Sequence, residues 1–357
     1  MKKLSVFLGV VFMTIGSAVS AQEVDSMAPM QMSSWGDANE SESIDYIPDV
    51  FLDTRVGYNQ DFTEGAGGFG ATGLYLDING YITPSLSYSF NHIIAANYFD
   101  PMVTGFDATQ WLNLTYEVGN FAFTAGKLSC NVGNYEYNAD VLDAYFDMNS
   151  RFYNMFDCYQ WGVAAEWYPA ENHTLNLQIT NSPLATDATQ FGYNLAWMGE
   201  CGWYEPYWTI NLWQYDENRY MKGLNLGNRL TFGNFSCDLE YMTRATSLKS
   251  AFRDDFNVIA APSYRVGEWL RIFGKYGWEH TSADLPYELI EEEFKGSDYM
   301  YYGGGLEFFP FKGDREVRFH IFWAGNNFGQ NILDIGLRWK FSMTNAVKSI
   351  LSRVEGK

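Results

Sequence analysis

Acidic side chains cluster in one segment whose pattern differs from that of its surroundings. Residues 130–159 read CNVGNYEYNADVLDAYFDMNSRFYNMFDCY, and their apolar residues recur at helical spacing. Asp140, Asp143 and Asp147 follow one another at intervals of three and four residues, which places them on one face of a short helix. Together with Glu136 they predict an acidic surface that acts on dissolved ions or dipolar solutes.

Basic side chains form a second set, on alternating segments near both ends of the chain. One face of these segments carries Arg55, Arg271, Lys275, Arg318, Arg338 and Lys340. His320 belongs to the same face, which also holds Asp53, Glu279, Glu307 and Asp334. We therefore expect a mixed wall that leans positive and faces the acidic segment. The alternative is that these charges simply neutralise one another.

No catalytic or metal-binding arrangement is recognisable. The four histidines belong to no readable triad, and Glu307 with Asp334 is better explained by salt bridges than by acid–base catalysis. The run Gly303–Gly305 lacks the Lys-Ser of a phosphate loop. The sequence thus predicts no enzymatic activity, no metal site and no cofactor.

Four cysteines leave two interpretations open, because their spacing matches no zinc pattern. Cys130 and Cys158 bracket the acidic segment, so a disulfide between them is one expectation for an exported protein. The other interpretation is that the cysteines are small apolar residues that fill space in the fold.

Short alternating segments must position these charges. Sixteen such segments, each of about ten residues, occupy residues 48–341, and NILDIGLRWKF at 331–341 is the last. At roughly 3.3 Å per residue and a tilt of about 40–45°, each segment spans about 24 Å, which matches the apolar band of an outer-membrane barrel. Soluble sandwiches use shorter strands.

The connections alternate in length. Every second connection is short, as at 83–85, 119–120 and 233–234, whereas most of the others are long, including 97–108, 130–159, 245–255 and 281–297. Short periplasmic turns and long extracellular loops are typical of bacterial transmembrane barrels. We predict an all-β, antiparallel transmembrane barrel of about 16 strands, whose third extracellular loop folds inward and contains a short helix.

Alternation also assigns faces. Around a watery lumen, Leu112, Leu114 and Tyr116 point to lipid and Asn113 and Thr115 point inward. Aromatic residues at strand ends, among them Trp213, Tyr215 and Trp339, are expected in interfacial girdles. The alternative is that they are ordinary core aromatics.

The ends of the chain differ from its middle. Lys2-Lys3, an apolar stretch and Val19-Ser20-Ala21 predict a signal peptide at 1–21, followed by a flexible acidic leader at 22–47. Residues 342–357 predict a short helical tail. Beyond the signal no run of about 18 apolar residues occurs, so membrane-spanning helices are excluded. The net charge of −20 argues against nucleic acid as a partner.

The chain resembles a known family around its acidic segment. The residues that carry the resemblance are Gly126-Lys127, Gly133, Glu136, Ser150-Arg151-Phe152 and Gln160-Trp161-Gly162. They are similar to those of Gram-negative outer-membrane porins, more closely the group that includes phosphate-selective porins. The resemblance implies passive diffusion of small hydrophilic solutes, a third loop that narrows the pore, and homotrimers. A phosphate specialist would line this loop with Arg and Lys, whereas the loop here is acidic.

We therefore predict an outer-membrane porin in which the acidic loop faces the basic wall across a narrow aqueous gap. The expected partners are outer-membrane lipid, lipopolysaccharide and the barrel-assembly machinery. The alternative is a structural or partner-binding barrel in a larger outer-membrane complex, in which the helical tail binds another protein.

Overall fold

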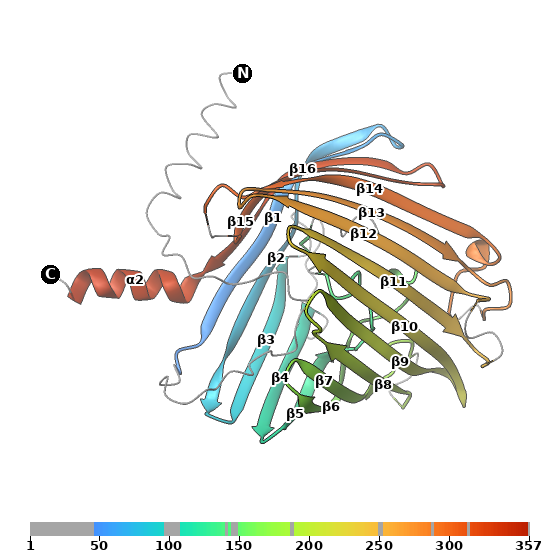
Figure 1. Ribbon diagram of the computed structural model, residues 1–357, viewed down its shortest axis with the longest axis horizontal. Coiled ribbons are helices and arrows are strands. Elements are labelled where there is room, and N and C mark those ends of the chain that lie inside the picture. The colour runs from blue at the N-terminus through green and yellow to red at the C-terminus, as the bar shows by residue number, and fades with distance from the viewer. Residues whose placement is uncertain are drawn as a thin grey trace.

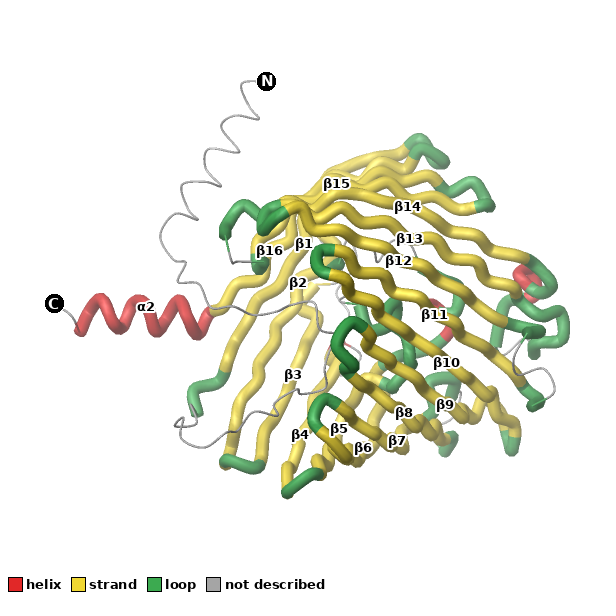
Figure 2. The backbone as a smooth tube through the Cα atoms, in the orientation of Figure 1, coloured by secondary structure: helices red, strands yellow, loops and turns green. Residues whose placement is uncertain are grey.

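A computed structural model describes residues 46–95, 108–139, 142–143, 149–185, 189–248, 253–286, 289–312 and 315–355. These residues form sixteen antiparallel strands in one closed barrel, which confirms the predicted all-β barrel and its number of strands (Figures 1 and 2). The strands are β1 Asp49–Asp61, β2 Ala66–Thr83, β3 Leu86–Ala95, β4 Thr109–Val118, β5 Phe121–Ser129, β6 Tyr159–Ala170, β7 His173–Asn181, β8 Phe191–Gly199, β9 Tyr204–Asp216, β10 Arg219–Phe232, β11 Phe235–Ala245, β12 Phe256–Val266, β13 Leu270–His280, β14 Asp298–Phe308, β15 Val317–Asn326 and β16 Asn331–Ser342.

The barrel closes by pairing its last strand with its first. In this register Thr54 lies opposite Trp339 and Arg55 lies opposite Arg338. Every strand therefore has two neighbours, and no sheet edge is left with unpaired backbone groups, which a lipid bilayer would not tolerate. NILDIGLRWKF is the strand that completes this closure.

Tight turns occupy one end of the barrel. Gly119 and Gly233 begin two-residue turns and have φ angles of +57° and +59°, which glycine adopts without steric cost. The opposite end carries the connections 130–158 and 281–297. Some connections at that end are nevertheless short, because Glu217 and Asn218 alone join β9 to β10.

The outer face is apolar, as the alternation predicted. Leu112, Leu114 and Tyr116 are each about 40–50% exposed on the outside, whereas Thr115 between them is buried. A lipid-facing exterior places the polar side chains on the inner wall.

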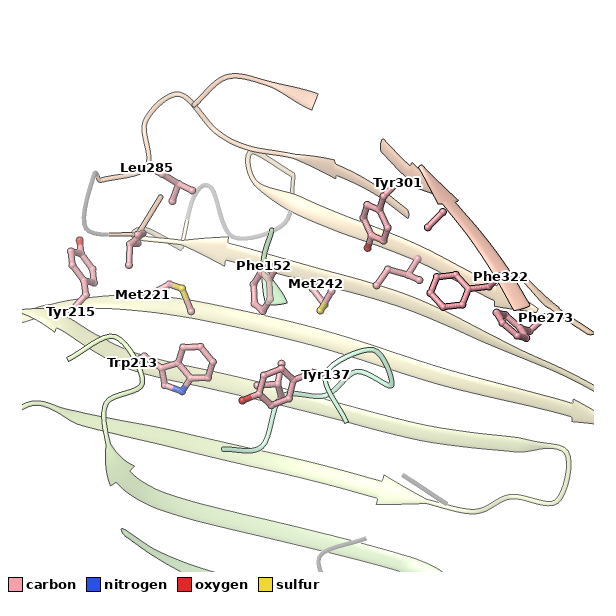
Figure 3. Packing of buried hydrophobic residues seen from close by; sticks show 14 residues of the cluster. Tyr137, Phe152, Trp213, Tyr215, Met221, Met242, Phe273, Leu285, Tyr301 and Phe322 are labelled. Atoms are coloured by element: carbon pink, nitrogen blue, oxygen red, sulfur yellow. The ribbon is translucent and has the colours of Figure 1, made fainter. Parts of the chain in front are cut away.

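Trp213 and Tyr215 correct one expectation, because they lie inside the barrel and not in an interfacial girdle (Figure 3). They are 0% and 3% exposed, while Ile210 on the same strand is 60% exposed. The period of two along β9 therefore turns Trp213 inward, where its indole nitrogen donates a hydrogen bond to Asn194 Oδ1 at 2.6 Å.

The chain continues after β16 as the helix α2, Met343–Glu355, which extends away from the barrel (Figure 1). Thr344 anchors its start, because Thr344 Oγ1 donates to the Pro48 carbonyl at 2.7 Å and accepts from the Val50 amide at 2.9 Å. Short 3-10 turns occur at Tyr153–Met155 and Glu292–Phe294. Among the described residues, no helix has the length and apolar character to cross a bilayer. The predicted signal peptide and nearly all of the leader lie outside the described residues.

Candidate channel lumen

The acidic segment follows β5, and its first residues lie against a row of neutral amide and hydroxyl side chains from β7 to β10. The Asn131 amide donates to Gln178 Oε1 at 2.8 Å, and Asn211 Nδ2 donates to the Asn131 carbonyl at 2.7 Å. The Gly133 amide donates to Thr209 Oγ1 at 2.9 Å. A Cβ on Gly133 would lie 2.6 Å from the backbone nitrogen of Thr209, so only glycine fits this contact.

Glu136 and Lys275, both singled out in the sequence, form a direct ion pair of 2.7 Å. The Glu136 carboxylate also accepts from the hydroxyl and the amide of Ser150, at 2.5 and 3.0 Å. Both members of the pair are buried. The arrangement differs from the expected aqueous gap, because carboxylate and ammonium touch.

Glu240 on β11 is a buried carboxylate that the sequence interpretation missed. It accepts hydrogen bonds from the backbone amides of Tyr135 and Glu136, at 3.0 and 3.1 Å. Strand alternation does place Glu240 on the inner face, but its partners lie more than 100 residues away in the sequence. Only the path of the loop brings them together.

Asp143 makes the second contact between the acidic segment and the basic wall. Its carboxylate lies 3.1 Å from Arg318 Nη2, and its carbonyl accepts from Arg55 Nη1 at 3.0 Å. Asp140 and Asp147 lie outside the described residues, as does most of the helix predicted there.

Arg244, Asp255 and Glu279 form a fully buried charged triad. Arg244 pairs with Asp255 at 2.5 Å and with Glu279 at 2.6 Å. Glu279 also accepts from the Arg151 amide of the acidic segment at 2.8 Å. Sequence reasoning placed Glu279 on the wall but overlooked Arg244 and Asp255, because the carboxylates that pair with Arg244 lie on other elements.

The Arg151 side chain points away from this triad, toward the connections that precede β14 and β16. Its guanidinium stacks on the rings of Phe294, Tyr299 and Phe328, with centroid distances of 4.2–4.9 Å, and donates to Ser297 Oγ at 2.9 Å.

The basic wall is present, and carboxylates accompany most of its cations. Arg318, Arg338 and Arg55 lie side by side in register across β15, β16 and β1. The short contacts with carboxylates are Arg338–Asp53 at 2.6 Å, Arg271–Glu307 at 2.8 Å, Arg318–Glu307 at 3.3 Å and His320–Asp334 at 2.5 Å. Lys340 instead lies 5.0 Å above the ring of Phe51. In the described structure this wall therefore carries its charge mainly as ion pairs.

An apolar cluster fills the space between the acidic segment and β9–β15 (Figure 3). Tyr137 and Phe152 of the segment belong to it, together with Trp213, Met242 and Tyr301 from the strands. The ring of Phe156 packs against Trp213 in a tilted arrangement, with a centroid distance of 4.6 Å. This part of the interior is packed like the core of a soluble protein.

Comparison with known proteins explains the architecture. Residues 51–200 match the family described as phosphate-selective porin O and P. Over these residues, which make up less than half of the chain, the protein is similar to that family. Among solved structures, a mutant of the Rh. blastica porin superposes with a TM-score of 0.59 at 11% identity, covering 83% of this chain and 100% of its own. The in-vitro folded OmpT of Vibrio cholerae, in its trimer form, superposes with a TM-score of 0.58 at 13% identity, covering 82% and 99%. No curated protein matches the sequence.

The matched range contains only part of the candidate lumen. It includes β1 to β8 and the acidic segment with Glu136 and Asp143, whereas Lys275, Arg318 and Arg338 lie outside it. The partners of the acidic segment therefore come mainly from strands beyond the match.

The four cysteines all lie in the described part of the chain, where none is joined to another. The disulfide considered between Cys130 and Cys158 stays a prediction. The two residues are neighbours, since the Cys130 amide donates to the Cys158 carbonyl at 2.8 Å, but Cys130 Sγ lies against Thr180 Oγ1 at 3.8 Å. Burial raises the pKa of Cys158 to about 12 and also raises the pKa of Cys130. The described residues contain no group of three or more His, Cys, Asp or Glu side chains able to hold a metal ion.

Proposed function

We propose that this porin passes small hydrophilic solutes or ions by passive diffusion, and that its third extracellular loop folds into the lumen and narrows it. The observation that carries the proposal is the pair of contacts that link this loop to inward-facing cations of the barrel wall. Glu136 reaches Lys275 on β13, and Asp143 reaches Arg318 on β15. A loop that hung outside the barrel could not make both.

The same contacts describe how the narrowing would stay in place. Side chains of β7 and β9 hold the start of the loop, Glu240 accepts two of its backbone amides, and Glu279 accepts the Arg151 amide near its end. A loop fixed at successive points keeps a constant aperture during solute passage. We propose that Asp140 and Asp147 lie on a short helix within this loop.

Specificity for phosphate is not part of the proposal. The arginines of the basic wall are buried, and neighbouring carboxylates pair with Arg271, Arg318 and Arg338. An anion would have to displace these carboxylates, because they occupy the guanidinium donors already.

Planar-bilayer recording of the purified protein tests the function. We expect open channels whose conductance rises with salt concentration, and liposome swelling that slows as the sugar added becomes larger. A protein that inserts but never conducts would contradict the proposal. Glu136→Gln, which weakens the bond to Lys275, should increase current fluctuations, whereas Glu171→Gln in an exposed periplasmic turn should not.

A second role, binding of a periplasmic partner, is favoured by α2. Its Met343, Val347 and Leu351 recur every fourth residue and are 40–54% exposed. Deleting residues 343–357 and comparing co-purified proteins tests this role. We also propose a homotrimer, since the similar OmpT structure is described as a trimer; chemical crosslinking in membranes tests that assembly.

A further inference from the structure

The two sides of the inner wall differ in their access to solvent. On β9 to β13, the inward-facing side chains that lie against the acidic loop are at most 6% exposed, from Asn211 and Trp213 through Asn225 and Met242 to Lys275. The acidic loop and its aromatic cluster cover this part of the wall. Farther along the same strands, Arg229 and Asp238 are 17% and 18% exposed. Water and solutes therefore have no room along the covered part in the described structure.

The inward-facing side chains of β2 to β4 are different, because most of them remain partly exposed. They are Asp77, Asn79, Tyr81, Ser87, Ser89, Trp111, Asn113 and Glu117. Hydrogen bonds hold several of them in place. Ser89 Oγ donates to Asn79 Oδ1 at 2.6 Å and accepts from Trp111 Nε1 at 2.8 Å. This side of the lumen is a prearranged, hydrated polar surface.

The charged residues of this surface favour cations over anions. β2, β3 and β4 contain no lysine or arginine, and their partly exposed inward carboxylates are Asp77 and Glu117. The arginines of the basic wall, which adjoins this surface at β1, are at most 7% exposed. Carboxylates that face water attract cations and repel anions, whereas buried ion pairs exert a weaker net field.

We infer that the conducting path is eccentric, that it follows the inner wall of β2 to β4, and that it favours cations and neutral polar solutes over phosphate-like anions. The inference rests on the proposed porin function and deepens it. Asp77 and Glu117 set the preference, while Asn79, Ser89 and Asn113 replace part of the hydration shell of a passing solute.

Cysteine scanning in planar bilayers tests the path. Asn113→Cys and Ser89→Cys place a thiol on the proposed path, and Asn225→Cys is the matched control on β10, where Asn225 is 0% exposed. A cationic methanethiosulfonate reagent should reduce the single-channel conductance of the first two variants by about twofold and leave the third unchanged. The unsubstituted protein receives the same reagent, because Cys201 is exposed.

The possible outcomes distinguish a failure of the eccentric path from a failure of the porin function. Channels that are blocked through Asn225→Cys but not through Asn113→Cys or Ser89→Cys would overturn the eccentric path and leave the porin function intact. Absence of any conductance in the unsubstituted protein would overturn the porin function itself.

Reversal potentials in a potassium chloride gradient test the preference. The unsubstituted channel should select potassium, and the double variant Asp77→Asn with Glu117→Gln should lower the cation-to-anion permeability ratio by about threefold at low salt, where screening is weak. Glu171→Gln, in an exposed turn, should leave the ratio unchanged. A chloride-selective unsubstituted channel, or a ratio that the double variant does not alter, would overturn the assignment.

Discussion

The interior of this barrel has two sides that are built from the same alternating strands yet are packed in opposite ways. Along β9 to β13 the inner wall is covered by the acidic loop and buries Trp213, Met242 and the triad around Arg244. Along β2 to β4 the inner wall remains polar and partly exposed. The comparison teaches that alternation decides only which side chains point inward. A loop then decides which of them become a core.

Replacing one tryptophan on each side tests most directly whether the two sides of the inner wall are packed differently. Trp213→Ala should reduce the free energy of unfolding by about 3–5 kcal/mol, because it removes a fully buried ring and leaves a cavity. Trp111→Ala on the open side should cost less than about 2 kcal/mol, because that ring is partly exposed. Urea unfolding in detergent or lipid measures both. Equal losses would mean that the two sides are packed alike.

Removing the cation of the buried triad should reduce the stability of the barrel by a comparable amount. Arg244→Leu should destabilise the barrel by about 3–5 kcal/mol, since it leaves Asp255 and Glu279 buried without their cation. Arg219→Leu, which breaks the exposed pair with Asp216, is the matched control and should have no measurable effect. Unfolding curves for the two variants would contradict the prediction if they coincided.

A smaller effect concerns the reactivity of the thiols. Cys130 and Cys158 lie at the base of the covered loop, and burial raises the pKa of both. At neutral pH they should react with a thiol reagent much more slowly than the exposed Cys201, because only the thiolate is nucleophilic. Mass spectrometry after timed labelling measures the order. Four reactive thiols after denaturation, without reductant, would agree with the absence of a disulfide.

The smallest effect on conduction is expected at the helix. Deleting residues 343–357 should leave single-channel conductance unchanged, because α2 extends away from the barrel and both sides of the lumen stay intact (Figure 1). A large change in conductance would mean that the helix reaches the mouth of the lumen, and the comparison of the two sides would then be incomplete.

The sequence by itself determined the strands, their number and their closure. Alternation is a local property, so each segment could be read independently, and the predicted 331–341 became β16 at Asn331–Ser342. The same local signal placed Lys275 on the inward face of its strand. It also indicated the family, since the residues that carry the resemblance lie close together in the chain.

Which charged residues pair, and which part of the inner wall remains exposed to solvent, depends on the tertiary structure. Glu136 finds Lys275 across 139 residues, and Glu240 finds the amides of Tyr135 and Glu136 across more than 100. Pairings of this kind depend on the path of a loop through the lumen, which no period in the sequence records. Alternation along β9 turns Trp213 inward, but only the loop supplies Phe156, which packs against its ring and makes it part of a core.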